Sequence, residues 1–569
     1  MNALLQRLTA PFANPVLRRE LRLITRRGHF EWVVLVLTVG MTLAIASVGG
    51  RANAGVHPAF IGKMLFQTFF GLAHGLVLVA GPAVAASSIA AEREGHTYEA
   101  LALTGLGPGQ IARGKFLAAF TNVGAYVIAL APVGALPFLF GGVSALSMVF
   151  AFGMLFVFTA LAALVGLAIS ARLPSTRSAL ITSVIAGVAL ALIMHGVFGE
   201  TLGDTLCAGA GMERPGTIWL PVLLAEGNLG GAATAMLIIG PLVVAALTGW
   251  FLLEVCSANL SDPTADRSSG LKRWFVASVF AGCALSVAPV IAASTTTERA
   301  MVAVNVIAGY AVFAMMCALV FQGDPIIAPR RVRLQWQLRG AGVLRRFFGP
   351  GATASAAMQL LAAAFALAVL SVAGLALSLA DSYGSSTAPL GIVAMALPVA
   401  TFILFVVGLA TWSRVRWGAA VGRVIVALTL LLLVVAPFAL TAILVAGTDA
   451  GETALPLLAA PSPAFALSVA RKVALDQTDV REVVAVLVCA VFYALFGLIA
   501  LVLASVRADR LISALDADAA RMDAVIASED AAPRVSRVPS PTAAVEPAAS
   551  AEPATAVPSI IADDKNTGS

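Results

Sequence analysis

The residues whose types and spacing best suit a partner-binding role lie in a short acidic segment at 87–115. Ser87 or Ser88 can cap the start of a helix there. Gly105 can end that helix in a left-handed conformation, and Pro108 can start the next one. We therefore expect a capped acidic helix that faces a partner, whereas a plain solvated loop would not need such ordered turn residues. The side chains it would present are Glu92, Glu94, Tyr98 and Glu99.

A second charged segment, residues 14–27, reads NPVLRRELRLITRR. Pro15 suits the first turn of a helix. Leu17, Leu21 and Ile24 then share one face, and arginines cover much of the remainder. This pattern is typical of a helix that lies in the membrane interface. A basic anchor without a partner fits the segment about equally well. Its charged residues of interest are Arg18, Arg19, Glu20 and Arg22.

The chain also contains a nucleotide-binding pattern that we interpret as accidental. Residues 109–115 match G-x-x-x-x-G-K, but Phe116 stands where a Ser or Thr would hold Mg²⁺. No hydrophobic strand precedes the pattern, and a long apolar run follows it at once. We therefore expect no nucleotide site in this chain, so that any ATP and Mg²⁺ would be bound by a separate subunit.

Support for catalytic or metal chemistry is weak. The sequence contains no H-E-x-x-H motif, and the first loop between apolar runs, 49–63, has no Asp or Glu. His74 lies inside an apolar run, where it either lines a pathway or packs as a hydrogen-bonded core residue, and packing is favoured. We expect no catalytic residue, no metal site and no enzymatic activity.

Composition shows what kind of protein must position these segments. Of 569 residues, 60% are hydrophobic and 12% are charged, which excludes a soluble enzyme. The apolar residues fall in runs of about 20, the length that crosses a bilayer as a helix. Basic residues lie between the runs, so the net charge of +6 reflects membrane orientation and not nucleic-acid binding. We predict an all-α, multi-pass membrane protein.

Twelve apolar runs are long enough to be spans. They cover residues 31–48, 64–86, 116–140, 146–171, 178–198, 232–254, 274–293, 301–321, 354–380, 389–411, 424–446 and 483–504. With the N-terminus inside, 29 of the 36 Lys and Arg residues fall in cytoplasmic segments and seven fall outside. Basic residues are enriched on the cytoplasmic side, so both termini are predicted to be cytoplasmic. Arginine far outnumbers lysine in an Ala-rich chain, which favours a bacterial inner membrane.

The runs group as six plus six. In each group the longest outer segment precedes the last span, at 199–231 and at 447–482, and each contains an apolar stretch broken by proline. Re-entrant or interfacial segments fit both. The predicted divisions are a cytoplasmic helix at 1–30, a membrane domain at 31–256, a linker at 257–273, a second membrane domain at 274–504, and a helix with a disordered Ala/Pro-rich tail at 505–569.

Several motifs in the first half resemble one transporter family. They are N-P-x-x-x-R-E at 14–20, A-E-R-E-G-x-T-x-E-x-L-x-L-T at 91–104, and R-G-K at 113–115. Together they are similar to the permease subunits of ABC-2-type transporters, closest to the branch that includes copper-enzyme-maturation permeases. The corresponding loop of the second half, 322–352, lacks the Glu-x-Glu-Gly pattern, so it is either a degenerate second coupling loop or a different element. The resemblance implies a connecting helix at 14–30 and a coupling helix around 92–104.

The resemblance also implies a mechanism. The coupling helix of such a permease docks a separate P-loop ATPase, of which two copies would bind a homodimer or a pseudo-dimer. The residues of this chain expected to carry the coupling are Glu92, Glu94, Gly95, Thr97, Tyr98, Glu99 and Leu103. An exporter is favoured over an importer.

An ion-coupled secondary transporter with a 6+6 repeat is the alternative function. No carboxylate lies deep in a predicted span, which argues against it, because such groups normally serve ion or proton relays. A membrane-embedded enzyme or a scaffold is a third and weaker reading.

Overall fold

A computed structural model of the protein shows an all-helical fold, with no β-strand among the residues that it describes. The structure describes residues 14–26, 30–49, 57–338, 340, 342, 347–379, 387–447, 459–477 and 479–531. The predicted disordered tail lies outside these residues. The described helices are long and apolar enough to identify a multi-pass membrane protein.

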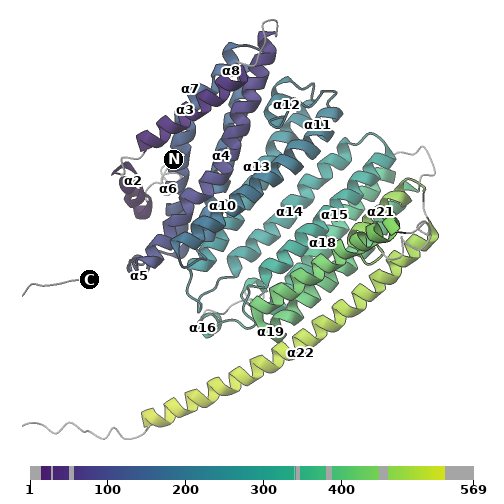
Figure 1. Cartoon of the computed structure of the whole chain (residues 1–569). Helices are drawn as coiled ribbons and strands as arrows, with labels where there is room; N and C mark the ends of the chain where they lie inside the picture. The colour runs from purple at the N-terminus through teal and green to yellow at the C-terminus, as the bar shows by residue number, and fades with distance from the viewer. Residues whose placement is uncertain are drawn as a thin grey trace, which may run out of the picture. The chain divides into compact units, whose positions relative to one another are not determined.

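The first half of the chain forms long helices joined by short ones (Figure 1). Its helices are α2 (Pro15–Arg26), α3 (Phe30–Gly49), α4 (Pro58–Glu94), α5 (Tyr98–Ala102), α6 (Pro108–Ala129), α7 (Ala131–Gly134), α8 (Leu136–Leu139), α9 (Ala145–Ser170), α10 (Thr176–Ile193), the π-helix η1 (Met194–Leu202), α11 (Gly203–Gly209), α12 (Leu220–Glu226) and α13 (Gly231–Leu260). Two turns predicted from the sequence are confirmed, because Gly105 has a φ of +78° and Pro108 begins α6.

The second half is built in a similar way. Its helices are α14 (Ser269–Ala292), α15 (Thr296–Phe321), α16 (Arg330–Leu338), α18 (Ala352–Leu379), α19 (Ala388–Gly447), α21 (Pro463–Ala474) and α22 (Val480–Ala531). Gly418 interrupts α19 with a non-helical φ of 84° and ψ of 179°, so two helical segments meet there. The helix predicted to follow the last span is the continuation of α22, and from Leu511 onward it belongs to a separate compact unit.

Nine described helices are long and apolar enough to cross a membrane, or ten if α6 and the helices after it form one span bent by 49°. This is fewer than the twelve predicted from the sequence. Two features account for the difference. The segments on either side of Gly418 run together as the single helix α19, and the apolar stretch described within α3, Trp32–Leu43, is shorter than a typical span.

Small residues let α4 pack closely against its neighbours α9 and α10. A Cβ on Gly166 of α9 would lie 2.1 Å from the Pro82 carbonyl oxygen of α4, and one on Gly187 of α10 would lie 2.5 Å from the Leu78 carbonyl oxygen. The backbones therefore approach too closely for any side chain, as is common between helices in membranes. In the second half α15 packs against α18 and α19, and the short helix α21 packs against α19.

One predicted boundary is wrong. Ser87 and Ser88 do not cap a new helix, because α4 continues without a break to Glu94. The sequence that follows Ser88, Ile-Ala-Ala-Glu-Arg-Glu, consists mostly of good helix formers, so the apolar helix extends about two turns beyond the predicted end of its span. The predicted coupling helix at 92–104 is consequently split between the last turn of α4 and α5.

The Gly166→Ala substitution is expected to lower the free energy of unfolding by about 1–3 kcal/mol, because its methyl group overlaps the α4 backbone. Gly153→Ala is the matched control on the same helix, since a Cβ there has no neighbour within 4 Å. Replacing this glycine should be neutral or stabilising by about 0.5–1 kcal/mol. Unfolding midpoints of both variants in one detergent test the difference, and equal midpoints would contradict it.

Candidate functional site

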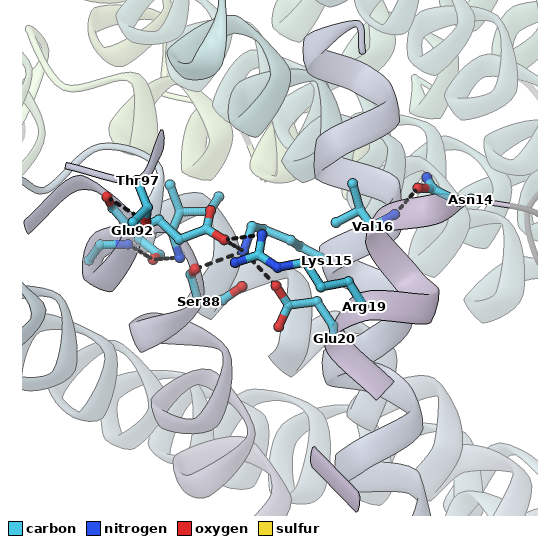
Figure 2. Close-up of polar contacts among 11 residues, drawn as sticks. Asn14, Val16, Arg19, Glu20, Ser88, Glu92, Thr97 and Lys115 are labelled. Atoms are coloured by element: carbon cyan, nitrogen blue, oxygen red, sulfur yellow. Dashed lines mark hydrogen bonds and ion pairs between the residues drawn. The ribbon is translucent and has the colours of Figure 1, made fainter. Parts of the chain in front are cut away.

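Side chains from α2, α4 and α6 meet and form a cluster of charges (Figure 2). The cluster lies at the end of α4 that leads into α5 (Figure 1). We define the charge cluster as Arg19, Glu20, Glu92 and Lys115. Two of these side chains are positive and two are negative, so the cluster is neutral as a whole. All four belong to the three sequence motifs that carry the family resemblance.

Lys115 is the centre of the charge cluster. Its side chain is fully buried, and its Nζ lies 3.1 Å from Glu20 Oε1 and 3.1 Å from Glu92 Oε1. It also donates a hydrogen bond of 2.9 Å to the Ser88 carbonyl oxygen. Arg19 is half-exposed and donates from Nη1 to the same Glu92 oxygen at 3.2 Å. A buried ammonium group is tolerated only with such partners, so Lys115 fixes the positions of α2 and α4 relative to α6.

The start of α2 fits against α6 through backbone contacts. Asn14 Oδ1 accepts a hydrogen bond of 2.9 Å from the Val16 amide, and Asn14 Nδ2 donates to the Gln110 carbonyl oxygen at 2.8 Å. Val16 and Leu17 are buried. A Cβ on Gly114 would come within 2.9 Å of Val16 Cβ, so glycine allows α2 to lie directly on α6. Asn14 and Gly114, which belong to two distant motifs, therefore both contribute to the contact between α2 and α6.

A tight turn connects the charge cluster to α5. The Thr97 amide donates to the Glu92 carbonyl oxygen at 2.9 Å, and the Gly95 amide donates to the Ala91 carbonyl oxygen at 2.9 Å. His96 adopts a φ of 54°, which reverses the chain. The backbone of the buried Glu92 thus holds the turn, while its side chain holds α2 and α6.

The inner side of α5 is attached to the end of α13. Tyr98 donates from its hydroxyl to the Leu260 carbonyl oxygen at 2.9 Å, and Arg93 lies over the Tyr98 ring at 5.5 Å from its centroid. Tyr98 and Leu101 pack against a buried apolar group that includes residues of α4, α6, α9 and α13. Glu99 is exposed, and the side chain of Leu103 is 88% exposed. Residues of four long helices therefore hold one side of the short helix α5. Its other side exposes Glu99, and Leu103 at its end is exposed as well.

The predicted coupling residues have different environments. Glu99, Leu103, Gly95 and Thr97 are exposed, whereas the structure buries Glu92 within the charge cluster. Glu94 is exposed, and its Oε2 accepts a hydrogen bond of 3.0 Å from the Thr176 amide at the start of α10. Of the residues expected on the connecting helix, Arg18 and Arg22 are exposed, and Arg19 and Glu20 join the cluster.

His74 lies within α4 and packs among aromatic rings. Its side chain is buried, its Nδ1 lies 2.6 Å from the Phe70 carbonyl oxygen, and its ring meets that of Phe158 edge to face at 5.2 Å. These contacts pack one side of the ring, whereas the buried Nε2 has no hydrogen-bond partner among the described residues. Within the described part of the chain, no three His, Cys, Asp or Glu side chains gather closely enough to hold a metal ion.

The second half has a buried carboxylate at the same end of the bundle. Asp324 follows α15, accepts a hydrogen bond from the Ser355 hydroxyl, and has its Oδ2 3.7 Å from Lys272 Nζ. Lys272 is fully buried and donates to the Gly349 carbonyl oxygen at 2.6 Å. Burial raises the pKa of Asp324 above its ordinary value, although the nearby lysine acts in the opposite direction. Like Glu92, Asp324 connects the end of one long helix to the starts of two others.

Sequence reasoning missed the role of Lys115, because it was considered only as part of a nucleotide-binding pattern. Its partners are separated from it by 95 and 23 positions, so no local spacing reveals the contact. The available signal was the combination of a lysine just before an apolar run with acidic residues at the ends of two neighbouring elements.

Lys115→Met is expected to lower the free energy of unfolding by about 3–5 kcal/mol, because it leaves Glu20 and Glu92 partly buried without their cation. Lys63→Met, at an exposed position of α4, is the matched control and should be nearly neutral. Adding Glu92→Gln to Lys115→Met should recover part of the loss. Detergent unfolding curves for the full cycle provide the test, and a nearly neutral Lys115→Met variant would contradict the description of the cluster.

The chain was also compared with known proteins. No protein-family model matches it, and no curated protein does.

Proposed function

We propose that this chain is the permease subunit of an ABC-2-type transporter, an exporter in which a separate P-loop ATPase docks on α5. One observation carries the proposal: the three motifs of the family resemblance, which are far apart in the sequence, meet in one charge cluster. A tight turn connects this cluster directly to α5. ATP and Mg²⁺ belong to the partner subunit, and this chain is not itself an enzyme.

The position of α5 supports a mechanical role. Force applied to α5 reaches α13 through Tyr98, α4 through the turn at His96, and α10 through Glu94. The cluster at Lys115 adds α2 and α6 to the same assembly. A movement of the docked ATPase would therefore be transmitted to several long helices together, which is what reorientation of a transport pathway requires.

We further propose twelve spans as six plus six, in a bacterial inner membrane with both termini cytoplasmic. Two observations support the count. The break at Gly418 divides α19 into two segments that are each long enough to cross, and α3 has 20 residues. The repeat is supported by packing, because α12 lies against α9 in the first half and α21 lies against α19 in the second.

The division of α19 can be tested by cysteine labelling in a variant whose five native cysteines are replaced by alanine. Because α19 crosses twice, Ser386→Cys and Thr448→Cys should react with a membrane-impermeant maleimide in intact cells. Ala420→Cys, just after the break, should react only after permeabilisation. Glu213→Cys serves as the outside control. Labelling of 386 and 448 from opposite sides of the membrane would contradict two crossings.

Docking on α5 can be tested by gentle purification of the tagged chain, with identification of the proteins that copurify and measurement of ATP hydrolysis. The double variant Glu99→Lys/Leu103→Asp changes the two groups that α5 presents outward. It should reduce the copurifying ATPase by about tenfold or more, the effect of losing one strong interface residue. Glu94 is unsuitable for this test, because its reversal would also disturb the start of α10.

Glu213→Lys is the matched control, since it reverses an exposed charge in the connection between α11 and α12. These two helices lie at the other end of the bundle from α5 (Figure 1). It should retain the ATPase. If the unaltered chain yields no ATPase and no hydrolysis even after crosslinking in intact membranes, the proposal fails. Transport that is abolished by collapsing the ion gradient at constant ATP would then favour the ion-coupled carrier.

A further inference from the structure

The helix α16 lies between the end of α15 and the start of α18, at the same end of the bundle as α5 (Figure 1). Both of its neighbours are candidate membrane spans. The chain that leads into α16 is held in place, because Gln322, Asp324 and Ala328 are buried. The position of α16 is therefore at the level where spans leave the bilayer.

The two faces of α16 differ in environment. Val332 is 4% exposed and Trp336, one turn later, is half-buried, so this face packs on the protein. Leu334 is 46% exposed and Leu338 is 83% exposed, on the opposite face. Two leucines one turn apart on the outer face of a polar helix would stay exposed to water, which is unfavourable because none of their apolar surface is buried.

The charge of this segment is strongly positive. Six arginines lie between positions 330 and 346, and no acidic residue follows Asp324 until Asp381. Arg330 and Arg331 are both exposed on α16. Asp262, in the loop before α14, is a carboxylate that faces Arg331 from a neighbouring element. The helix α16 itself carries three arginines and no acidic residue.

The corresponding helix of the first half, α5, carries one acidic residue and no basic residue. The exposed side chains near it include Glu99, Leu103 and Glu94, and Arg177 faces Glu94. A protein surface complementary to that acidic helix would be basic and would be repelled by α16. The two helices therefore do not suit the same partner, although both occupy a loop that follows a long helix at this end of the bundle.

We propose that α16 lies in the plane of the membrane surface, with Leu334 and Leu338 among the acyl chains and its arginines on anionic phospholipid headgroups. Exposed leucines combined with arginines on a short helix are the features of an in-plane amphipathic helix. A zwitterionic membrane would bury the leucines but would not pair with the arginines. The lipid at this site is therefore anionic, such as phosphatidylglycerol. This role depends on the chain being a membrane protein and is independent of the proposed transport function.

The test uses the full chain, free of native cysteines, with a spin label at Leu338→Cys in nanodiscs of phosphatidylcholine with or without phosphatidylglycerol. Collision with oxygen reports lipid, and collision with a water-soluble nickel chelate reports water. In discs with phosphatidylglycerol the label should be shielded from nickel and accessible to oxygen. Adding Arg330→Gln/Arg331→Gln should shift the label toward water, by up to about thirtyfold in the partition that two surface arginines supply.

A label at Leu103→Cys is the matched control, because Leu103 is equally exposed but lies beside acidic residues. It should remain accessible to nickel in both kinds of disc. A label at 338 that is in water in both lipids overturns the proposal, and so does one that becomes shielded only when a protein partner is added. Shielding that does not change between the two lipids or on loss of the arginines overturns the assignment to anionic headgroups.

Discussion

The arrangement of α2, α4 and α6 depends on the buried ammonium group of Lys115. An unpaired cation in this position would be strongly destabilising, so two carboxylates from different elements must reach it. One of them comes from α2 and the other from the end of α4. The need to neutralise one charge thus determines where three segments meet. The contacts of Asn14 and Gly114 at the start of α2 and the backbone hydrogen bonds of the turn into α5 act together with this neutralisation.

Close backbone packing and charge pairing support each other in this region. Gly114 lets α2 approach α6 closely enough for Arg19 and Glu20 to reach the cluster. Farther along α4, Gly166 and Gly187 of its neighbours permit equally close contacts. The helices are therefore held as a unit in the apolar layer by shape and at its edge by charge. This division follows from the solvent, because a bilayer gives no hydrophobic driving force for helices to associate.

The long helices and the turns at Gly105 and Pro108 were predictable, because apolar run length and backbone chemistry are local properties of the sequence. The end of α4 could not be predicted in the same way. The serines at 87 and 88 can cap a new helix, but the stretch after Ser88 also has high helix propensity, and only packing decides whether α4 ends there or continues. The burial of Glu92 was equally hidden. Its partners lie on other elements, whereas Glu94 and Glu99 of the same acidic segment are exposed, so the segment as a whole gave the opposite indication.

Both halves of the chain contain a buried carboxylate that joins the end of one helix to other helices, but the residues around it differ. Glu92 and Asp324 each lie near the end of a long helix, and each is paired with side chains from the starts of other helices. A lysine is present in both clusters, but Ser355 supplies in the second half a contact that a charge supplies in the first. The internal clusters are therefore alike, whereas the surfaces above them are acidic at α5 and basic at α16. Because the interior is constrained by the cost of burying charge and the surface is not, the two halves can keep a common framework and still present different surfaces to their surroundings.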